Sequence, residues 1–474
     1  MSERTIVREV PPDDERRMGT AATYTLISGA LLTMLSFFIT NVALPSIGTD
    51  LHATPAALQL VIGCYGIATA ALVVVGGRLG DSYGRKRLFL IGMAGFGVFS
   101  LLCALSPNIG TLLAMRAGQG ASGAMMTPQV LAIISATLTG EHRVRAIGLF
   151  GAAGGLATAF GQILGGVLVE ANIAGLQWRS VFLVTVPISA VGFVFALRLL
   201  PETKAERRLA IDWVGAILLI VTLSLLLFPL TEGRPLGWPL WIWLVMAASV
   251  PAGAAFLFLQ RRLDGTLRTP LVPPSTIALP PLRLGLTVAV AFFTTFGGFM
   301  FVVAIATQTG AGMSALEGGL TLLSMAIGFL AVSIPLPALQ RRYGGYLITT
   351  GWIMLIIGYC ALGAVVLLSW PHITPWNLAA PLLVGGAGQG LVMMPLFGVV
   401  IDQVPAEQAG LGSGVLVTTQ QTCIALGAAT VGTAYLALTT SAWGQGGAFA
   451  ATSIGIAIIG LAAIPLSQRL AKAH

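Results

Sequence analysis

Arg116 is the one charged residue deep within a long apolar stretch of this 474-residue chain. Gln119 follows three positions later, so in a helix it shares a face with Arg116. Insertion scales put a charge at the bilayer centre at about 2.5–3.5 kcal/mol, so the guanidinium should face a polar interior and have a partner. Two interpretations are equally open. Arg116 is a structural group held by backbone carbonyls, or it binds an anionic or strongly hydrogen-bonding part of a small molecule.

Single polar side chains interrupt other apolar stretches in the same way. An amide without a partner in hydrocarbon costs about 1–3 kcal/mol, so each should face a neighbouring helix or a bound molecule. Aromatic residues nearby could form an adaptable apolar wall for lipophilic ligands, with helix packing or lipid contact as the alternative for each. Besides Arg116 and Gln119, the candidate binding residues are Ser36, Phe37, Asn41, Tyr65, Gln162, Phe292, Phe296, Gln389, Gln420 and Gln421.

The composition predicts the elements that hold these residues. Hydrophobic residues make up 56% of the chain and charged residues 9%. Apolar runs recur that are long enough to cross the roughly 30 Å hydrocarbon core as helices, whereas the alternating strands of a β-barrel are absent. We expect an all-α membrane protein with fourteen spans, at about residues 24–46, 55–78, 88–106, 109–135, 144–169, 179–200, 211–231, 237–260, 283–306, 314–339, 346–370, 375–400, 409–438 and 447–467.

The distribution of basic residues predicts the orientation in the membrane. With an even number of spans both termini lie on one side, and that side holds 22 of the 25 Lys and Arg residues. By the positive-inside rule this side is the cytoplasm. The net charge of +8 is therefore expected to face anionic lipid headgroups and not nucleic acid.

Two parts of the chain resemble each other. Gly118-Gln119-Gly120 returns as Gly388-Gln389-Gly390, and a pair of methionines follows each copy. Repeated halves are typical of transporters with a binding site at the midplane. We therefore divide the chain into an N-terminal tail, a first six-helix repeat, two inserted spans, a cytoplasmic linker, a second six-helix repeat and a C-terminal tail, at residues 1–22, 23–200, 201–262, 263–282, 283–467 and 468–474.

The segment Gly76–Arg87 places glycines, one acid and three consecutive bases between two apolar runs. This pattern predicts a tight cytoplasmic corner between two membrane helices. An aspartate near a helix N-terminus is favoured by the partial positive charge there. We expect this corner to act in gating or as a topology signal, through Gly77, Asp81, Gly84, Arg85 and Arg87.

Several of these motifs resemble signatures of one family. Gly77–Arg87 resembles the loop signature of the major facilitator superfamily, and Met115–Gly120 resembles its fourth-span signature. The segments 35–45, 161–166 and 178–187 are similar to signatures of its fourteen-span drug:proton antiporters. The chain departs from them at four positions: Ser36 replaces the usual acid of the first span, Gln162 a proline, Ala157 a glycine and Thr185 an asparagine.

The resemblance implies a secondary transporter of the cell (inner) membrane that exports lipophilic drugs by alternating access, as a monomer without a cofactor. It also implies that the Gly77–Arg87 corner latches the two halves together, near the start of the thirteenth span. In the family the arginine at the position of Arg116 works beside the first-span acid, which here is Ser36.

Proton coupling is left open by the acidic residues. All 17 Asp and Glu lie in the tails, in loops or close to span ends, and the four His lie in loops or the C-terminal tail. A proton carrier needs a partly buried carboxylate or His. The alternative function is a same-fold transporter of a physiological solute such as a lipid, a metabolite or an antibiotic. An enzyme is disfavoured, because no metal-ligand or catalytic cluster lies within the spans.

Overall fold

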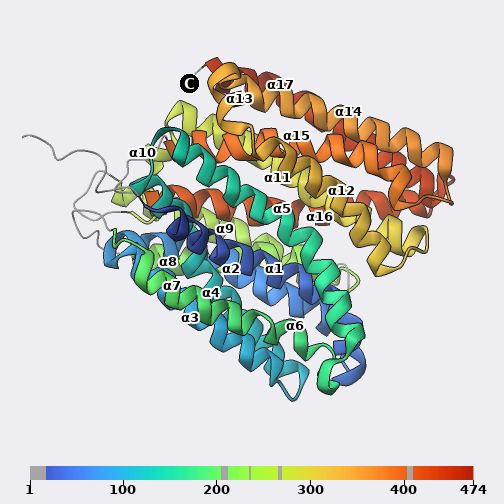
Figure 1. The fold of residues 1–474 in the computed structure, drawn as a ribbon, viewed down its shortest axis with the longest axis horizontal. Helices are drawn as coiled ribbons and strands as arrows, with labels where there is room; N and C mark the ends of the chain where they lie inside the picture. Colours follow the sequence, from blue (N-terminus) through green and yellow to red (C-terminus); the bar gives the residue numbers. More distant parts are fainter. Residues whose placement is uncertain (1–17, 204–211, 234–235, 265–269, 403–408, 473–474) are drawn as a thin grey trace, which may run out of the picture.

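The computed structural model describes residues 18–203, 212–233, 236–264, 270–402 and 409–472, and the secondary structure in these ranges is helical. The long helices run side by side in one bundle (Figure 1). Its elements are α1 (Thr20–Asp50), α2 (Pro55–Tyr83), α3 (Arg85–Ala104), α4 (Ile109–Thr137), α5 (Gly140–Ala171), η2 (Ile173–Gly175), α6 (Arg179–Leu183), α7 (Thr185–Leu199), α8 (Trp213–Glu232), α9 (Leu240–Leu263), α10 (Pro274–Ile277), α11 (Pro280–Ile305), η3 (Ala306–Gly310), α12 (Ala315–Ser333), α13 (Leu336–Tyr343), α14 (Tyr346–Ser369), α15 (Pro375–Asp402), α16 (Ala409–Thr439) and α17 (Gly444–Lys472).

Eleven segments of the described chain are long and apolar enough to cross a membrane, or twelve if the bent pair formed by α12 and α13 is one span. The all-helical membrane fold is thus confirmed, and the count of fourteen is not. The helices α4 and α5 fall outside the count. Both are long, but α4 carries Arg116 and many small or polar residues, and α5 begins with charged residues and is rich in glycine.

The main packing contacts in the first part of the chain have counterparts in the second. Helix α4 packs on α2 and α3, as α15 packs on α12 and α14. Helix α1 packs on α5 and α7, as α11 packs on α16 and α17. Between the two groups, α5 packs on α12 and α16 packs on α2. This pattern is what two copies of one six-helix unit would produce.

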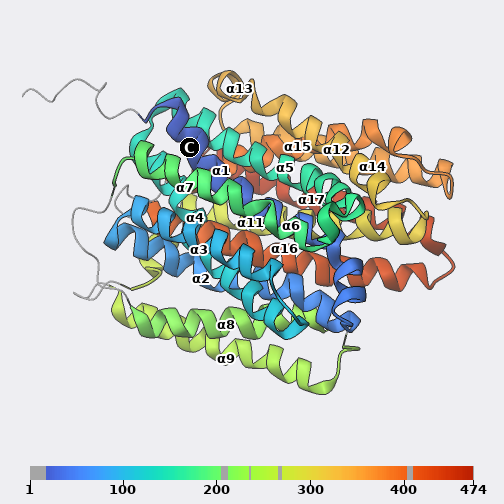
Figure 2. The same cartoon turned by 60° about the horizontal axis from the view of Figure 1, so that its bottom comes forward.

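Helices α8 and α9 form a hairpin along one side of the bundle (Figure 2), where α8 packs on α2 and α16. The connection after α9 was expected to be an extended linker, but it contains the short helix α10, and α11 begins at Pro280. Gln260 Oε1 accepts a hydrogen bond from the Val272 backbone (2.9 Å), while Gln260 Nε2 donates to Asp212 (2.7 Å). These bonds hold the connection against the hairpin.

Local breaks and extensions separate the observed helices from the predicted spans. The predicted tenth span bends by 61° between α12 and α13, beside Pro335, because proline lacks an N–H and disrupts the helical ladder. The predicted sixth span is divided into α6 and α7. Helix α2 continues to Tyr83, so the corner expected over Gly76–Arg87 is reduced to Gly84 alone, whose φ of 115° favours glycine.

Candidate functional site

Arg116 lies at the centre of a buried polar network between α1, α2 and α4. Its side chain is 0% exposed. Nε donates to the Val61 carbonyl (3.0 Å), and Nη1 donates to Ser36 Oγ (3.2 Å) and to Gln119 Oε1 (2.5 Å). Nη2 is buried and has no hydrogen-bond partner in the described part of the chain. The network holds the guanidinium and leaves one donor available.

Aromatic rings take the place of a carboxylate around this charge. The guanidinium carbon of Arg116 lies 4.4 Å from the Tyr65 ring centroid and 5.7 Å from that of Phe182. A desolvated cation over an aromatic face gains about 2 kcal/mol. Among the described residues no acid pairs with Arg116. Ser36, which stands where the resembling family usually has an acid, therefore contacts Arg116 through its hydroxyl group.

The two glutamines of the sequence repeat occupy similar environments. Gln119 Nε2 donates to Ser100 Oγ on α3 (2.7 Å), and Gln389 Nε2 donates to Tyr359 Oη on α14 (3.3 Å). Both glutamines are buried. The residue that corresponds to Arg116 at the same 270-residue offset is Gly386, where a Cβ would collide with the Met325 carbonyl oxygen. The second half thus keeps the amide but excludes the charge.

The predicted aromatic residues lie in two separate clusters. Phe37 is 6.3 Å from Tyr65 between ring centroids, which places it beside the Arg116 network. Phe292 is 1% exposed and stacks on Phe296 at 6.3 Å, and it also meets the Trp352 ring edge-on at 6.1 Å. Phe292 therefore packs α11 on α14, which favours a structural role over the predicted ligand wall.

The remaining predicted binding residues do not join the Arg116 network. Asn41 is exposed and donates to the Phe37 carbonyl of its own helix (3.1 Å). The Gln162 side chain lies outside the described residues. Gln420 is buried and Gln421 half-buried on α16, and Thr418 on the same helix donates to the Ala70 carbonyl of α2 (3.4 Å). Polar residues of α16 thus help to join the two groups of helices.

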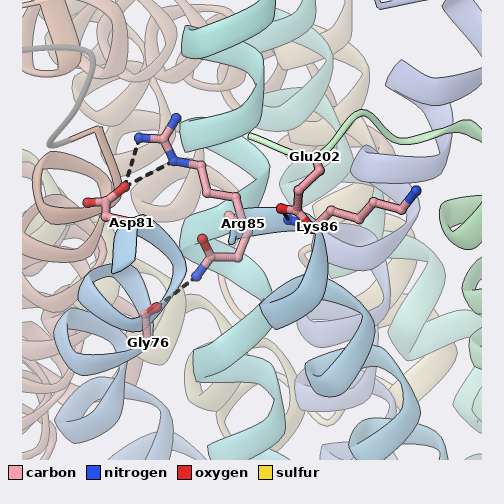
Figure 3. A network of polar contacts seen from close by, with 6 residues as sticks. Gly76, Asp81, Arg85, Lys86 and Glu202 are labelled. Atoms are coloured by element: carbon pink, nitrogen blue, oxygen red, sulfur yellow. Dashed lines mark hydrogen bonds and ion pairs between the residues drawn. The ribbon is translucent and has the colours of Figure 1, made fainter. Parts of the chain in front are cut away.

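The motif that was predicted to act in gating folds into a compact network of polar contacts at the C-terminal end of α2 (Figure 3). Arg85 donates to Asp81 Oδ1 from Nη2 (2.8 Å) and Nε (3.0 Å), and the two side chains are 2% and 0% exposed. Glu202 accepts from the Lys86 backbone (3.2 Å) and lies 3.8 Å from the exposed Arg87. A Cβ at Gly84 would come within 2.6 Å of Glu202, which gives a second reason for glycine there.

Arg85, which donates to Asp81, belongs to the same half of the molecule as Asp81. Residues 403–408, just before α16, lie outside the described residues, so the predicted latch to the start of the thirteenth span remains a prediction. Gly77 is buried in α2. Neighbouring Gly76 and Gly80 pack tightly on α4, because Gln129 Nε2 donates to the Gly76 carbonyl (2.8 Å).

Arg78 was not among the predicted site residues. Its buried guanidinium donates to the backbone carbonyls of Leu271 (2.8 Å) and Pro270 (2.6 Å). The connection between the inserted hairpin and the second repeat is therefore tied to the same motif. The only signal in the sequence was the position of Arg78 within that motif.

Several contacts join the two groups of helices toward the end of the bundle that holds the Gly76–Arg87 motif. Glu141 and Arg341 form an ion pair between the start of α5 and α13. Phe150 packs on Phe397 at 5.7 Å between ring centroids. A Cβ at Gly414 would lie 3.0 Å from Val74 Cα, so α16 and α2 are in close contact there.

At the opposite end of the bundle, Asp50 joins α1 to α6. Asp50 Oδ2 accepts from Trp178 Nε1 (2.9 Å) and from Arg179 Nη1 (2.6 Å). The Trp178 bond, followed by the Arg179 bond, lowers the pKa of Asp50 below its usual value. Arg179 also lies over the Trp178 ring, 4.4 Å from the centroid.

Comparisons with known proteins agree with this geometry. The profile of the Major Facilitator Superfamily matches residues 26–428. A probable actinorhodin transporter of Streptomyces coelicolor is 35% identical over 90% of this chain and 74% of its own length. The cephamycin export protein CmcT of Amycolatopsis lactamdurans is 31% identical over 98% and 94% of the two chains. In fold, the chain is similar to the crystal structure of the human organic anion transporter MFSD10 (TETRAN), with a TM-score of 0.66, 18% identity and coverage of 97% and 100%.

Proposed function

Because this chain belongs to the Major Facilitator Superfamily, we propose that it is a secondary transporter that exports small lipophilic molecules from the cell by alternating access. It is a multi-pass membrane protein of a transporter family and not an enzyme. Its similarity to antibiotic and multidrug export proteins supports export as the direction and small organic molecules as the substrate class.

The observation that carries the substrate proposal is the Arg116 network. Arg116 keeps a buried positive charge without a described acidic partner, and its Nη2 has an unused donor. A substrate that presents an anionic or strongly accepting oxygen would satisfy this donor and neutralise the charge. The neighbouring rings of Tyr65 and Phe37 offer an apolar surface for the rest of the molecule.

We propose fourteen crossings, as in the drug:proton antiporters of this superfamily. Helices α4 and α5 have 29 and 32 residues, which at about 1.5 Å per residue exceeds the thickness of the hydrocarbon core. Both are surrounded by other helices of the bundle, so a lower hydropathy is tolerated. Added to the twelve candidate spans, they would give fourteen. An even count puts both termini on one side, and the excess of basic residues on that side supports the cytoplasm.

Proton antiport is part of the proposal, with a monomer as the functional unit in the cell membrane. An export process against a concentration gradient needs an energy source, and the sequence has no phosphate-binding loop for direct use of ATP. The alternative is a transporter of the same fold with one physiological solute, such as a lipid, a metabolite or an antibiotic.

Transport by the purified protein in liposomes tests these proposals together. Anionic, neutral and cationic dyes of similar hydrophobicity, and labelled lipids, are followed with and without a pH gradient, beside Arg116→Ala liposomes and empty liposomes. We expect gradient-dependent movement of several compounds, with the anionic dye most affected by Arg116→Ala. No movement of any compound refutes export, movement without a gradient refutes antiport, and movement of a single compound favours the alternative.

A further inference from the structure

Glu232, the last residue of α8, is a buried acid without a partner. Its side chain is 1% exposed, and neither carboxylate oxygen has a hydrogen-bond partner in the described part of the chain. An ionised carboxylate in such surroundings is strongly disfavoured, and the group responds by holding a proton. The sequence placed Glu232 just beyond the end of the predicted span 211–231, among the acids of loops and span ends, so its burial is a result of the fold.

The described residues of the turn between α8 and α9 fold back over the end of α8 that carries Glu232. The Leu236 backbone donates to the Glu232 carbonyl (3.1 Å), and the Trp238 backbone donates to the Gly233 carbonyl (2.7 Å). The Trp238 indole lies so close to Gly233 that a Cβ there would be 2.5 Å from the ring. The chain thus folds back tightly over the end of α8, two residues beyond the span Trp213–Leu230.

Helix α2 places Glu232 near the Arg116 network. Helix α8 packs on α2, and both the Glu232 carboxylate and the Arg116 guanidinium act electrostatically on Cys64 of α2. Cys64 lies one helical turn after Val61, the residue that accepts from Arg116 Nε. The acid of the inserted hairpin and the arginine of the first repeat are therefore close to the same segment of α2.

The other described acids have partners or are exposed. Asp81 pairs with Arg85 and Glu141 with Arg341. The remaining partnered acids are Asp50 (Arg179), Glu202 (Lys86 N), Asp212 (Gln260), Asp264 (Ser275) and Glu317 (Ser314), while Glu170 is exposed. His52, His142 and His372 are exposed as well. Among the acids and histidines whose side chains are described, Glu232 alone combines burial with the lack of a bonded partner.

We propose that Glu232 is the group that takes up and releases the transported proton, in place of the first-span acid that is Ser36 in this chain. This inference rests on the proposed proton-coupled export. In the present conformation Glu232 keeps its proton, because its carboxyl group is buried and has no hydrogen-bond partner in the described part of the chain. When α2 moves relative to α8 and water reaches the carboxyl group, the O–H bond breaks and the proton passes to water on the side that is open.

The charged surroundings of Glu232 agree with exchange near neutral pH. Burial raises its pKa to about 7. Cys64 of α2 lies within electrostatic reach of Glu232. The bases Arg261 and Arg262 of α9 are at the far end of that helix, and the titratable groups of α16 among the described side chains are Cys423 and Tyr435. Arg234, which follows in the turn, lies outside the described residues.

The test compares Glu232→Gln with Glu170→Gln, an exposed acid at the end of α5 that serves as the matched control. Infrared spectroscopy of the purified protein follows the carbonyl band of protonated carboxyl groups during a pH titration. We expect a band that disappears around neutral pH in the wild type and in Glu170→Gln, and that is missing in Glu232→Gln. A band that persists unchanged in Glu232→Gln overturns the proposal, and this measurement requires no substrate.

Transport in liposomes supplies the second readout. We expect Glu232→Gln to lose efflux driven by a pH gradient while it retains exchange of dye across the membrane at equal pH. Gradient-driven efflux at the wild-type rate in Glu232→Gln overturns the proposal. If Glu232→Gln loses both gradient-driven efflux and exchange at equal pH, the proposal is also overturned, and Glu232 is assigned to binding a cationic part of the substrate. If the wild type moves no compound, the proposed function fails, and the infrared titration still decides whether Glu232 exchanges a proton.

Discussion

Replacing Asp81 with asparagine removes a negative charge from the C-terminal end of α2 while keeping the shape of the side chain. Both members of the Asp81–Arg85 pair are buried, and two hydrogen bonds of Arg85 converge on one oxygen at 2.8 and 3.0 Å. Breaking a buried charge pair by replacing one of its members costs about 3–5 kcal/mol. We expect Asp81→Asn to insert normally but to unfold at a lower temperature.

Asp81→Asn changes transport only if the lost stability differs between the two conformations of the alternating-access cycle. A difference of about 1.4 kcal/mol shifts a two-state equilibrium tenfold. If about one third of the loss is specific to the present conformation, the fraction in the other conformation rises roughly tenfold. Helix α2 packs on α16, with Gly414 against Val74, seven residues before Asp81, so we expect the contact between the two halves to loosen and export to become weaker.

The assay combines export per molecule in liposomes with the labelling rate of a cysteine placed at Thr418, which contacts the Ala70 carbonyl of α2. The four native cysteines are replaced beforehand. Glu202→Gln is the matched control, because its pair with Arg87 is solvent-exposed and worth about 0–1 kcal/mol. If export and labelling in Asp81→Asn both equal the wild type at matched expression, the gating role of the pair is refuted.

Three further outcomes are expected. Arg116→Lys should lower export by about tenfold or more at normal expression, measured in liposomes, because an ammonium group cannot reproduce the planar fork of the guanidinium. Asp50→Asn should lower the thermal unfolding midpoint at pH 7, because the charge-assisted bond to Arg179 is lost. The difference from wild type should vanish as the pH falls through the lowered pKa of Asp50, since protonation of the wild-type acid removes the same bond. Gly161→Ala should destabilise the protein by about 1–3 kcal/mol in thermal unfolding, since the new Cβ would lie 2.8 Å from Phe38 Cβ on α1; an unchanged midpoint would contradict this close contact.

Local sequence patterns predicted contacts well where both partners lie on one helix. Arg116 and Gln119 were expected to share a face, and they form a hydrogen bond of 2.5 Å. Gln119 and Gln389 were recognised as equivalent positions of a repeat, and in the structure each amide meets a hydroxyl on the neighbouring helix. A spacing of three or four residues fixes such relations, because helical geometry is the same in every sequence.

Contacts between helices were less accessible to prediction. In a membrane bundle the outer faces are as apolar as the buried ones, so periodicity does not show which face meets which neighbour. The predicted wall residue Phe292 packs on Trp352, and Asn41 is exposed. The partners of Arg78 lie about 190 residues further along the chain, a distance at which no local pattern operates.

The sequence by itself determined the class of the protein: its composition requires helices that cross a membrane, its basic residues predict the cytoplasmic side, and its motifs indicate the superfamily. Only the tertiary structure decided how charge is arranged within the bundle. It brought Ser36 to Arg116 and left Glu232 buried without a partner. The physical reason is that solvation of a side chain depends on what packs over it, and residues distant in the sequence supply that cover.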